Sequence, residues 1–405
     1  MTERLYYHDS FLYEFDAVVV DAVSTNGRPA LILDRTAFYP TSGGQVFDTG
    51  WIVSDGKKIG VAEVAEDDDG AILHLVDDVA AIGKGSAVRG LIEAARRRDH
   101  MQQHSGQHVL SAAFVRLFNQ PTVSFHMGVE ACSIDLDTKA LTAAQVEAAE
   151  SLANEVVTQN RAVEIRFVTR EEAVGLGLRK LPPAERDQLR LIEIHDFDLT
   201  ACGGTHVAAT GQVGCILLRK IEKVRQGFRV EFVCGQRAVA TARQDYAKLS
   251  EAAGVLSAHI WDLPQQIRKS QEEIRVSRKA GEKLMEELAD LLAARLLAEA
   301  APEGARIVIV RTFPDRDLSF VKLLAQRLTR QSRNVVALLA TVSDSPGLVF
   351  AQAPGQPFDM GALMKEALAR LGGRGGGSKD MAQGGPTDAN GVDAVLQQLS
   401  AKLAG

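Results

Sequence analysis

Two short segments of this chain carry pairs of side chains that bind transition metals. His104 and His108 lie four residues apart in HSGQH, and Cys202 and His206 lie four residues apart in CGGTH. The first pair falls in a segment with helical spacing, so both imidazoles emerge from one face of a helix. The two glycines of the second segment allow a tight turn that brings sulfur and imidazole together. Three nitrogens and one thiolate form a donor set suited to tetrahedral zinc.

Spacing alone leaves two questions about this set open. A third histidine, His100, falls one turn before His104 on a similar face, so two of three histidines have to be chosen. The histidines lie nearly opposite Leu110, Phe114 and Leu117 on a helical wheel, which disfavours their being core residues. A structural zinc would use all four ligands, whereas a catalytic zinc needs an open position. A catalytic zinc would polarise a carbonyl or activate water, and both suit ester hydrolysis.

The chain that positions these ligands is long enough to form more than one domain. A chain of 405 residues predicts two or three domains, and 46% hydrophobic with 24% charged residues is typical of a soluble globular protein. No segment approaches the roughly 18 apolar residues of a membrane helix, and the first residues lack the apolar core of a signal peptide. The four cysteines are scattered without disulfide spacing, so we expect a reducing, cytoplasmic location.

The pattern along the chain predicts an α+β protein with four parts. Short strands with turn signals over residues 1–92 predict a β-barrel, and alternating helices and strands over 93–238 predict an α/β domain that carries the ligands. Charged helical sequence over 239–301 predicts a helical hairpin with a coiled-coil-like seam. Residues 302–405 predict a small α/β domain with a glycine-rich loop at 371–386.

Two basic stretches interrupt a chain whose net charge is −6. One is Arg96–Arg98, and the other runs from Arg219 to Arg243 beside the CGGTH segment. From charge alone a solvated face is the favoured interpretation, and phosphate binding is the alternative.

These segments together resemble a known family. HSGQH followed by CGGTH resembles the paired motifs of the alanyl-tRNA synthetase editing domain, of the free-standing AlaX proteins and of the threonyl-tRNA synthetase editing domain. FYPTSGGQVFDTG (38–50) is similar to the glycine-rich motif of the β-barrel that precedes that domain. GGRGGGSKDMAQGG (372–385) resembles the signature of the C-terminal domain shared by alanyl-tRNA synthetases and DHH phosphoesterases. The matches occur in family order, so the chain is identified as a member of the large AlaX type.

The resemblance implies a zinc-dependent hydrolase that removes serine, or glycine, from mischarged tRNA(Ala). It implies that Zn²⁺ is held by the four residues of the two motifs, with His100 outside: His104, His108, Cys202 and His206. The residues implied to contact the substrate are Thr41, Gly43, Gly44, Gln45, Gln107 and Thr205. In this context the basic residues expected to hold acceptor-stem phosphates are Arg219, Lys220, Lys223, Arg225 and Arg229.

Some features depart from the family pattern or allow another interpretation. No class II aminoacylation domain precedes the motifs, so we expect no tRNA charging, and Gln107 stands where synthetases usually have threonine. Residues 41–45 alone predict only a β-turn. A DHH-type phosphoesterase would need clustered aspartates, and the chain offers Asp99-His100-Met101. A non-catalytic tRNA-binding protein with a structural zinc is the other rival.

The C-terminal half is expected to add tRNA affinity and to form a homodimer. An intramolecular helical hairpin would use the same apolar seam, and is the alternative to the dimer.

The ligand assignment predicts opposite outcomes for two neighbouring histidines. His104→Ala should lose bound zinc and deacylation of mischarged tRNA, whereas His100→Ala should keep its zinc. Metal analysis of the purified variants measures this. Loss of metal from His100→Ala with retention in His104→Ala would show that the wrong histidine has been assigned.

Overall fold

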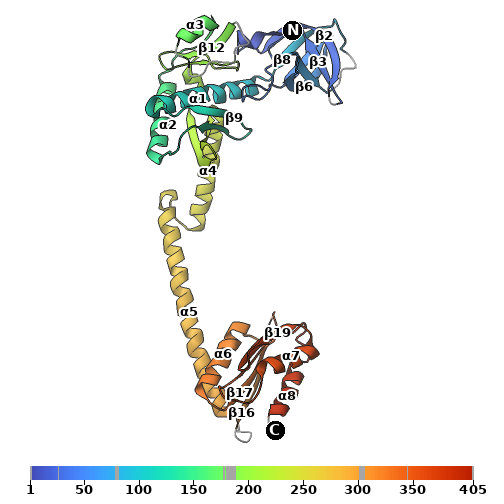
Figure 1. The fold of residues 1–405 in the computed structure, drawn as a ribbon, viewed down its shortest axis with the longest axis vertical. Helices are drawn as coiled ribbons and strands as arrows, with labels where there is room; N and C mark the ends of the chain where they lie inside the picture. The colour runs from blue at the N-terminus through green and yellow to red at the C-terminus, as the bar shows by residue number, and fades with distance from the viewer. Residues whose placement is uncertain are drawn as a thin grey trace. The chain divides into compact units, whose positions relative to one another are not determined.

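The computed structural model describes residues 2–25, 27–77, 82–176, 178, 188–300, 306–343 and 345–403 (Figure 1). The chain divides into two compact units, Met1–Glu251 and Ala252–Gly405, each of which is described by itself. None of the helices in these ranges combines the length and the apolar character needed to cross a membrane.

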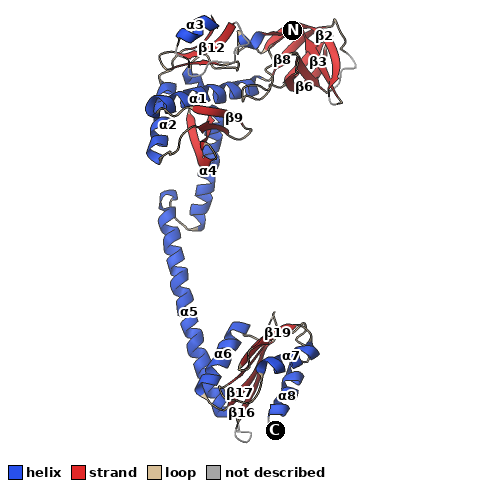
Figure 2. Cartoon of the chain, in the orientation of Figure 1, coloured by secondary structure: helices blue, strands red, loops and turns tan. Residues whose placement is uncertain are grey.

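The first unit begins with a closed antiparallel barrel of six strands, shown in red in Figure 2. Alternating residues of the first strand, such as Phe15, Ala17 and Val19, point into the core of the barrel, as the period of two in a strand requires. This confirms the predicted barrel. In spatial order the strands are β2 (Glu14–Thr25), β3 (Arg28–Leu33), β7 (Ile72–Val76), β6 (Lys57–Glu66), β5 (Gly50–Ser54) and β8 (Ala87–Ile92). Outside it lie β1 (Glu3–Arg4), β4 (Arg35–Thr36) and the short 3-10 helix η1 (Leu5–Tyr7).

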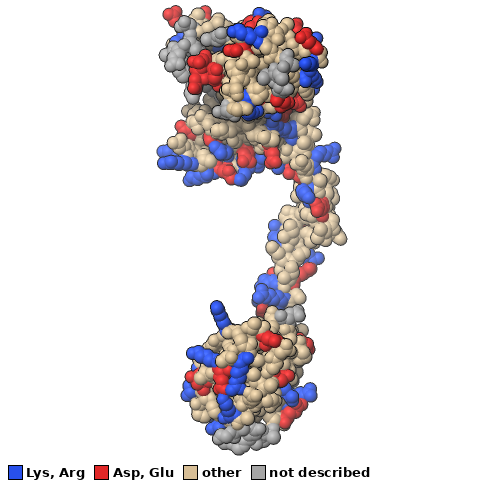
Figure 3. All heavy atoms as spheres, turned by 90° about the vertical axis from the view of Figure 1, so that its right-hand side faces the viewer, with Lys and Arg blue, Asp and Glu red and all other residues tan. Residues whose placement is uncertain are grey.

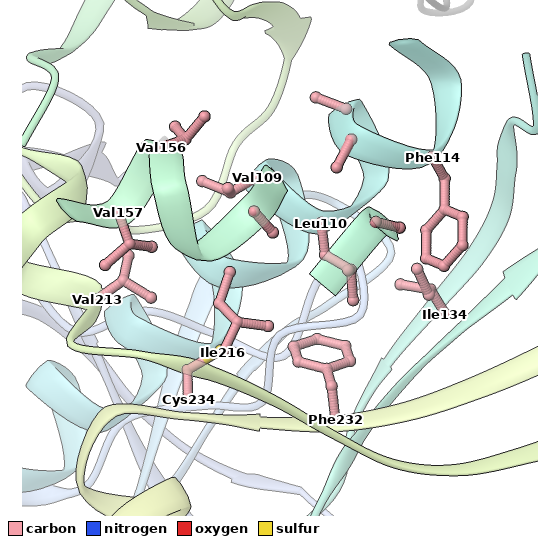
Figure 4. Packing of buried hydrophobic residues seen from close by; sticks show 14 of the residues in the cluster. Val109, Leu110, Phe114, Ile134, Val156, Val157, Val213, Ile216, Phe232 and Cys234 are labelled. Carbon is pink, nitrogen blue, oxygen red and sulfur yellow. The ribbon is translucent and has the colours of Figure 1, made fainter. Parts of the chain in front are cut away.

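The α/β domain packs two helices on a four-stranded sheet. Helix α1 (Ala94–Phe118) and helix α2 (Ala143–Thr158) share a core with the sheet, in which Leu110, Phe114 and Phe232 are fully buried (Figure 4). Thr142 caps α2 through a reciprocal bond with Gln145. The sheet order is β14 (Ile216–Val224), β15 (Gly227–Cys234), β10 (Cys132–Leu136) and β9 (Thr122–Met127), and the predicted β14–β15 hairpin is confirmed.

A second, three-stranded sheet leads into the CGGTH segment. Its strands pair antiparallel in the order β11 (Val163–Thr169), β12 (Gln188–Ile194) and β13 (Asp198–Ala201), with helix α3 (Arg170–Gly175) after β11. Cys202 follows β13 directly, and the 3-10 helix η2 (Thr210–Val213) comes shortly after His206. Because β13 is held in register by β12, the start of the CGGTH segment is fixed in place.

Helix α1 is buried on both sides, which the helical wheel did not predict. Leu110 and Phe114 lie in the core as expected, but Leu117 is 42% exposed and His104 is only 2% exposed. The histidine face is covered by Gln45, from the segment between β4 and β5, and by Cys202 of the CGGTH segment. Both residues are distant from α1 in sequence, so a helical wheel does not show these contacts.

The second unit is a mixed sheet covered by helices on both faces. The sheet order is β16 (Ile307–Phe313), β17 (Val335–Thr341), β18 (Gly347–Gln352), β20 (Met381–Gly385) and β19 (Arg374–Gly377), with β16 and β17 parallel. Alternate residues of β17 pack on opposite faces. One face meets α5 (Leu263–Glu299) and α6 (Leu318–Gln331), and the other meets α7 (Met360–Leu371) and α8 (Val392–Leu403).

One expectation for this part of the chain needs correction. The glycine-rich segment predicted as a loop forms the hairpin β19–β20 at the edge of the sheet. The apolar seam predicted on the long helix is exposed at Ile274, Leu284 and Leu291, so its partner stays a prediction, while α5 packs against α6 through Ala293 and Leu296. Helix α4 (Gly235–Val255) and α5 are separate helices with Pro264 in the first turn of α5, and their pairing as a hairpin stays a prediction.

A buried ion pair docks α1 on the barrel. Arg97 and Asp48 are both fully buried, and the Arg97 guanidinium donates to both Asp48 carboxylate oxygens at 2.5–3.1 Å. Its remaining N–H groups donate to the carbonyls of Ser10 (2.9 Å) and Ala37 (2.5 Å). Arg97 belongs to the basic stretch for which a solvated face was the favoured interpretation, and for this residue that interpretation is wrong.

Removing one partner of this pair should strongly destabilise the first unit. Arg97→Met leaves the Asp48 carboxylate buried without its cation, which costs roughly 3–5 kcal/mol in the free energy of unfolding. Arg89→Met is the matched control, because its pair with Glu14 is largely exposed and should contribute at most about 1 kcal/mol. Urea unfolding followed by the fluorescence of Trp51, in a Trp261→Phe background, measures both. Equal destabilisation by the two variants would contradict this role of Arg97.

Candidate metal centre

The structure brings together the four side chains of the two motifs. His104 and His108 come from α1, and Cys202 and His206 come from the segment after β13. One potential ligand atom of each lies within 4.8 Å of the others. The Cys202 sulfur is 3.4 Å from His104 Nε2 and 3.3 Å from His206 Nε2. The cluster is therefore formed by two elements about 95 residues apart in sequence.

Two of the three imidazoles have a hydrogen-bond partner on the outer nitrogen. His104 Nδ1 lies 2.7 Å from the Gln45 side-chain oxygen, and His206 Nδ1 lies 3.1 Å from the Ser105 hydroxyl. His108 Nδ1 lies 3.8 Å from a carboxylate oxygen of Asp198, a distance too long for a hydrogen bond. The partners of His104 and His206 fix these two rings and leave Nε2 with its lone pair turned to the centre, as metal-ligating histidines require.

Burial and mutual charge set the protonation of the cluster. Burial alone would raise the pKa of the Cys202 thiol, but the charge of the adjacent His104 and its hydrogen bond to the sulfur outweigh burial and hold this pKa well below its usual range. Burial lowers the pKa of His206 to about 3, so this imidazole is neutral at pH 7. The pKa of His108 is lowered by burial, yet its interactions with Asp198 and Cys202 raise it overall. A thiolate beside a neutral imidazole is the state in which these groups bind a metal.

The donor set fits zinc. Zinc takes nitrogen and sulfur ligands at about 2.0–2.3 Å, which places tetrahedral ligands roughly 3.3–3.8 Å apart. The two measured sulfur–nitrogen separations, 3.4 and 3.3 Å, lie in that range. Among the described residues this is the only group of three or more His, Cys, Asp or Glu side chains placed to hold a metal ion.

Gly204 lets the CGGTH segment approach His104 closely. A Cβ atom at residue 204 would lie 2.2 Å from Cε1 and 2.4 Å from Nδ1 of His104. A Cβ at Gly203 would meet only Tyr7, at 3.6 Å, which is an ordinary contact. The second glycine of the motif is therefore required by packing, and the first is not.

The turn at residues 41–45 lies beside the cluster. Ser42 and Gln45 bond each other's backbone, with Gly43 and Gly44 at positive φ, so the β-turn predicted from sequence is present. Gln45 is fully buried and bonds Thr205 as well as His104. Thr41 and Gly43 are exposed on the turn.

The other predicted substrate residues occupy different environments. Gln107 is buried and donates to the Ser111 hydroxyl at 2.8 Å. Gly44 packs against the backbone of Phe125, whose ring stacks on His104 with centroids 5.3 Å apart. His100 is buried but is not part of the cluster, and burial lowers its pKa to about 4. Contact of Gln107 and Gly44 with substrate stays a prediction.

The basic residues predicted to hold phosphates are only partly free. Arg219 pairs with Asp245, Lys220 with Glu222, and Arg229 with Asp135. Lys223 and Arg225 have no ionic partner within the described ranges. Positive and negative side chains are mixed over the face of the first unit in Figure 3.

Four residues of the site were not predicted from sequence. Ser105, Asp198 and Phe125 contact the ligand histidines, and Arg190 holds the carbonyl of Cys202 at 2.6 Å. Only Ser105 carried a sequence signal, because it lies inside HSGQH. The others reach the site through strand pairing.

Comparison with protein families and known proteins gives matches along the chain. Residues 5–96 match the class II (A) tRNA synthetases, 189–229 the second additional domain of threonyl and alanyl tRNA synthetases, and 308–405 the DHHA1 domain. The chain is 32% identical to the alanyl-tRNA editing protein AlaX-L of Pyrococcus horikoshii, over 95% of this chain and 94% of that protein. It is 31% identical to the alanine–tRNA ligase of Pyrococcus furiosus over 99% of this chain, and 33% identical to that of Halobacterium salinarum over 98%. It spans 44% of the length of each ligase.

The two glycines of CGGTH predict unequal effects on metal binding. Gly204→Ala should lower bound zinc, because its Cβ would displace the His104 ring or the segment itself. Gly203→Ala, the matched control, should keep near-wild-type zinc. Metal content after dialysis against a zinc buffer measures both, and full retention of zinc in Gly204→Ala would show that the close approach is not needed.

Proposed function

The chain belongs to the family of AlaX-L alanyl-tRNA editing proteins, and on this premise we propose that it hydrolyses the ester joining serine to mischarged tRNA(Ala). Glycine is the second expected substrate. The reaction is a carboxylic ester hydrolysis and needs no ATP. Because the chain spans less than half of the alanine–tRNA ligases that it matches, their other activities are not transferred to it.

The cluster of His104, His108, Cys202 and His206 is the observation that carries this proposal. Its nitrogen and sulfur donors suit zinc, which supplies a Lewis acid for a carbonyl oxygen when bound. Gln45 and Ser105 orient the rings of His104 and His206 from outside, and the Asp198 carboxylate lies 3.8 Å from the ring of His108. The rings are almost fully buried, so they limit the access of bulk water to an ester placed beside them.

We propose that the basic hairpin contacts the acceptor stem. Lys223 and Arg225 lie next to the β14–β15 turn without an ionic partner among the described residues, so they are available to phosphates. Arg219, Lys220 and Arg229 would have to exchange a carboxylate for a phosphate. The second unit is proposed to add tRNA affinity, and the exposed apolar positions of α5 keep the homodimer as a proposal.

Selectivity requires the serine hydroxyl to be recognised. A buried polar group left unpaired by alanine costs about 1–3 kcal/mol, which is roughly tenfold to a hundredfold in rate per group. Gln107 and Thr205 are buried polar residues of the two ligand segments, and Thr41 is the exposed candidate on the barrel turn. A site that bonds the hydroxyl would thus protect correctly charged tRNA(Ala).

This mechanism predicts faster removal of serine than of alanine from the same tRNA. Gln107→Ala should reduce that ratio about tenfold or more while zinc content stays near the wild-type value. Gln102→Ala is the matched control on the same helix, because its amide bonds the carbonyl of Gln212 instead. Release of free amino acid from seryl- and alanyl-tRNA(Ala) measures the ratio. Comparable rates for the two substrates with the wild-type protein would refute the editing function.

A further inference from the structure

The outer face of the barrel carries a contiguous group of apolar side chains. Alternation along β5, β8 and β2 points Trp51, Leu91 and Val18 outward, because residues beside them fill the barrel core. Trp51 pairs directly with Leu91, and Val53 follows on the same side of β5. Trp51 is 38% exposed and Val18 is 43% exposed. Single exposed apolar residues are common on proteins, whereas a contiguous group marks an interaction surface.

Trp51 and Lys58 form a cationic aromatic pair at one end of this face. The Lys58 Nζ lies 3.8 Å from the centre of the Trp51 ring, close enough for a cation–π interaction. The residue directly opposite Trp51 on β6 is Gly60, which contributes no side chain over the ring. Within the described ranges Lys58 forms no ion pair. The pair therefore presents a large apolar ring together with a positive charge.

A pocket of about 500 Å³ lies beside this pair on the same face. Its apolar lining includes Val18, Val53 and Ala87. Val18 and Ala87 are cross-strand partners on β2 and β8, and Val53 lies two residues from Trp51 on β5. The pocket and the Trp51–Lys58 pair are thus neighbours on the outer surface of the barrel.

The charged lining of the pocket is mostly acidic. It includes the carboxylates of Asp16, Asp34 and Asp55. The two arginines of the lining, Arg35 and Arg89, are each paired with a carboxylate of their own. Asp16 and Asp55 form no ion pair in the part of the chain that the structure describes. This acidic pocket is therefore suited to a ligand that brings a cation and an apolar group.

A second copy of this chain fits the acidic pocket better than RNA does. The carboxylates would repel phosphates, whereas the Trp51–Lys58 pair supplies a ring for the apolar lining and a cation for Asp16 and Asp55. Tryptophan is also among the residues that contribute most to association between proteins. Because the pair and the pocket lie on one face, a two-fold axis between them inserts the pair of each copy into the pocket of the other.

We propose that two copies of this chain associate through this face of the barrel, with the Trp51–Lys58 pair of each copy in the acidic pocket of the other. The contact belongs to the first unit alone and is distinct from the homodimer proposed through α5. It also goes beyond the proposed hydrolysis, because no group of the metal centre takes part in it.

The fluorescence of Trp51 reports this association directly. The full-length Trp261→Phe variant keeps Trp51 as its only tryptophan. We expect its emission maximum to move to shorter wavelength as the protein concentration rises, because the ring leaves water when the dimer forms. Sedimentation velocity on the same samples measures the dimer. Association through α5 alone would leave the emission of Trp51 unchanged.

Charge reversal tests the contact between the pair and the pocket. In the Trp261→Phe background, Lys58→Glu should weaken self-association at least about tenfold, because an acidic side chain then meets an acidic pocket. Asp16→Lys combined with Asp55→Asn should have a similar effect, since a basic pair then meets a basic pocket. Asparagine is chosen at residue 55 because it tolerates the positive φ found there.

An equimolar mixture of these two variants should associate again, because the acidic pair of one variant meets the basic pocket of the other. Lys223→Glu is the matched control, since Lys223 is also an exposed lysine without an ion pair in the described ranges but lies on β14. It should associate like the wild type. Zinc content and the circular dichroism spectrum of every variant show that it is folded.

Three results would overturn the proposed contact. One is a Trp51 emission that does not change with protein concentration, and another is self-association of Lys58→Glu equal to that of Lys223→Glu. The third is a mixture of the two charge variants that stays dissociated. An emission shift caused by added tRNA but not by the protein itself would show that RNA occupies this face, and would equally overturn the second copy.

Discussion

The buried ion pair between Arg97 and Asp48 is the constraint from which the geometry of the metal centre follows. Arg97 and His104 are seven residues apart on α1, so the face that docks on the barrel also presents the ligand histidines. Docking places Gln45, three residues before Asp48, against His104. Ser10 links the other half of the site, since its carbonyl accepts from Arg97 and its hydroxyl from the backbone of His206. One interaction thus aligns both ligand pairs.

A metal bound in such a centre would contribute to the stability of the first unit. Four donor side chains are gathered in the interior, and desolvation of a thiolate and three imidazoles is unfavourable unless a cation compensates it. The outer partners of His104 and His206 are already in place, so these two rings would need little reorganisation when a metal binds. The binding free energy of the metal would then add to the stability of the fold around it.

Local pattern was enough to predict the barrel, the β14–β15 hairpin and most helices of the second unit. The choice of His104 over His100 as a ligand came from the family resemblance. The features that local sequence pattern did not predict depend on contacts between residues distant in sequence. In the sequence, Arg97 belongs to a run of basic residues that resembles a solvated face. Only the fold brings it into a buried ion pair with Asp48. Glycine disfavours strands, so residues 371–386 were predicted as a loop, and it is the pairing of β20 with β18 and of β19 with β20 that makes two strands of this segment. The position of Arg190 next to Cys202 likewise depends on the pairing of β12 with β13.

The two units contribute differently to the candidate site. The ligands and the groups that orient their rings all belong to residues before Glu251. In the described part of the second unit, no group of His, Cys, Asp and Glu side chains is placed to hold a metal. The four ligands come from the first unit, so the sheet register and the barrel docking of that unit fix their geometry. The described part of the second unit contributes no ligand, so a substitution on its surface leaves the set of ligands unchanged.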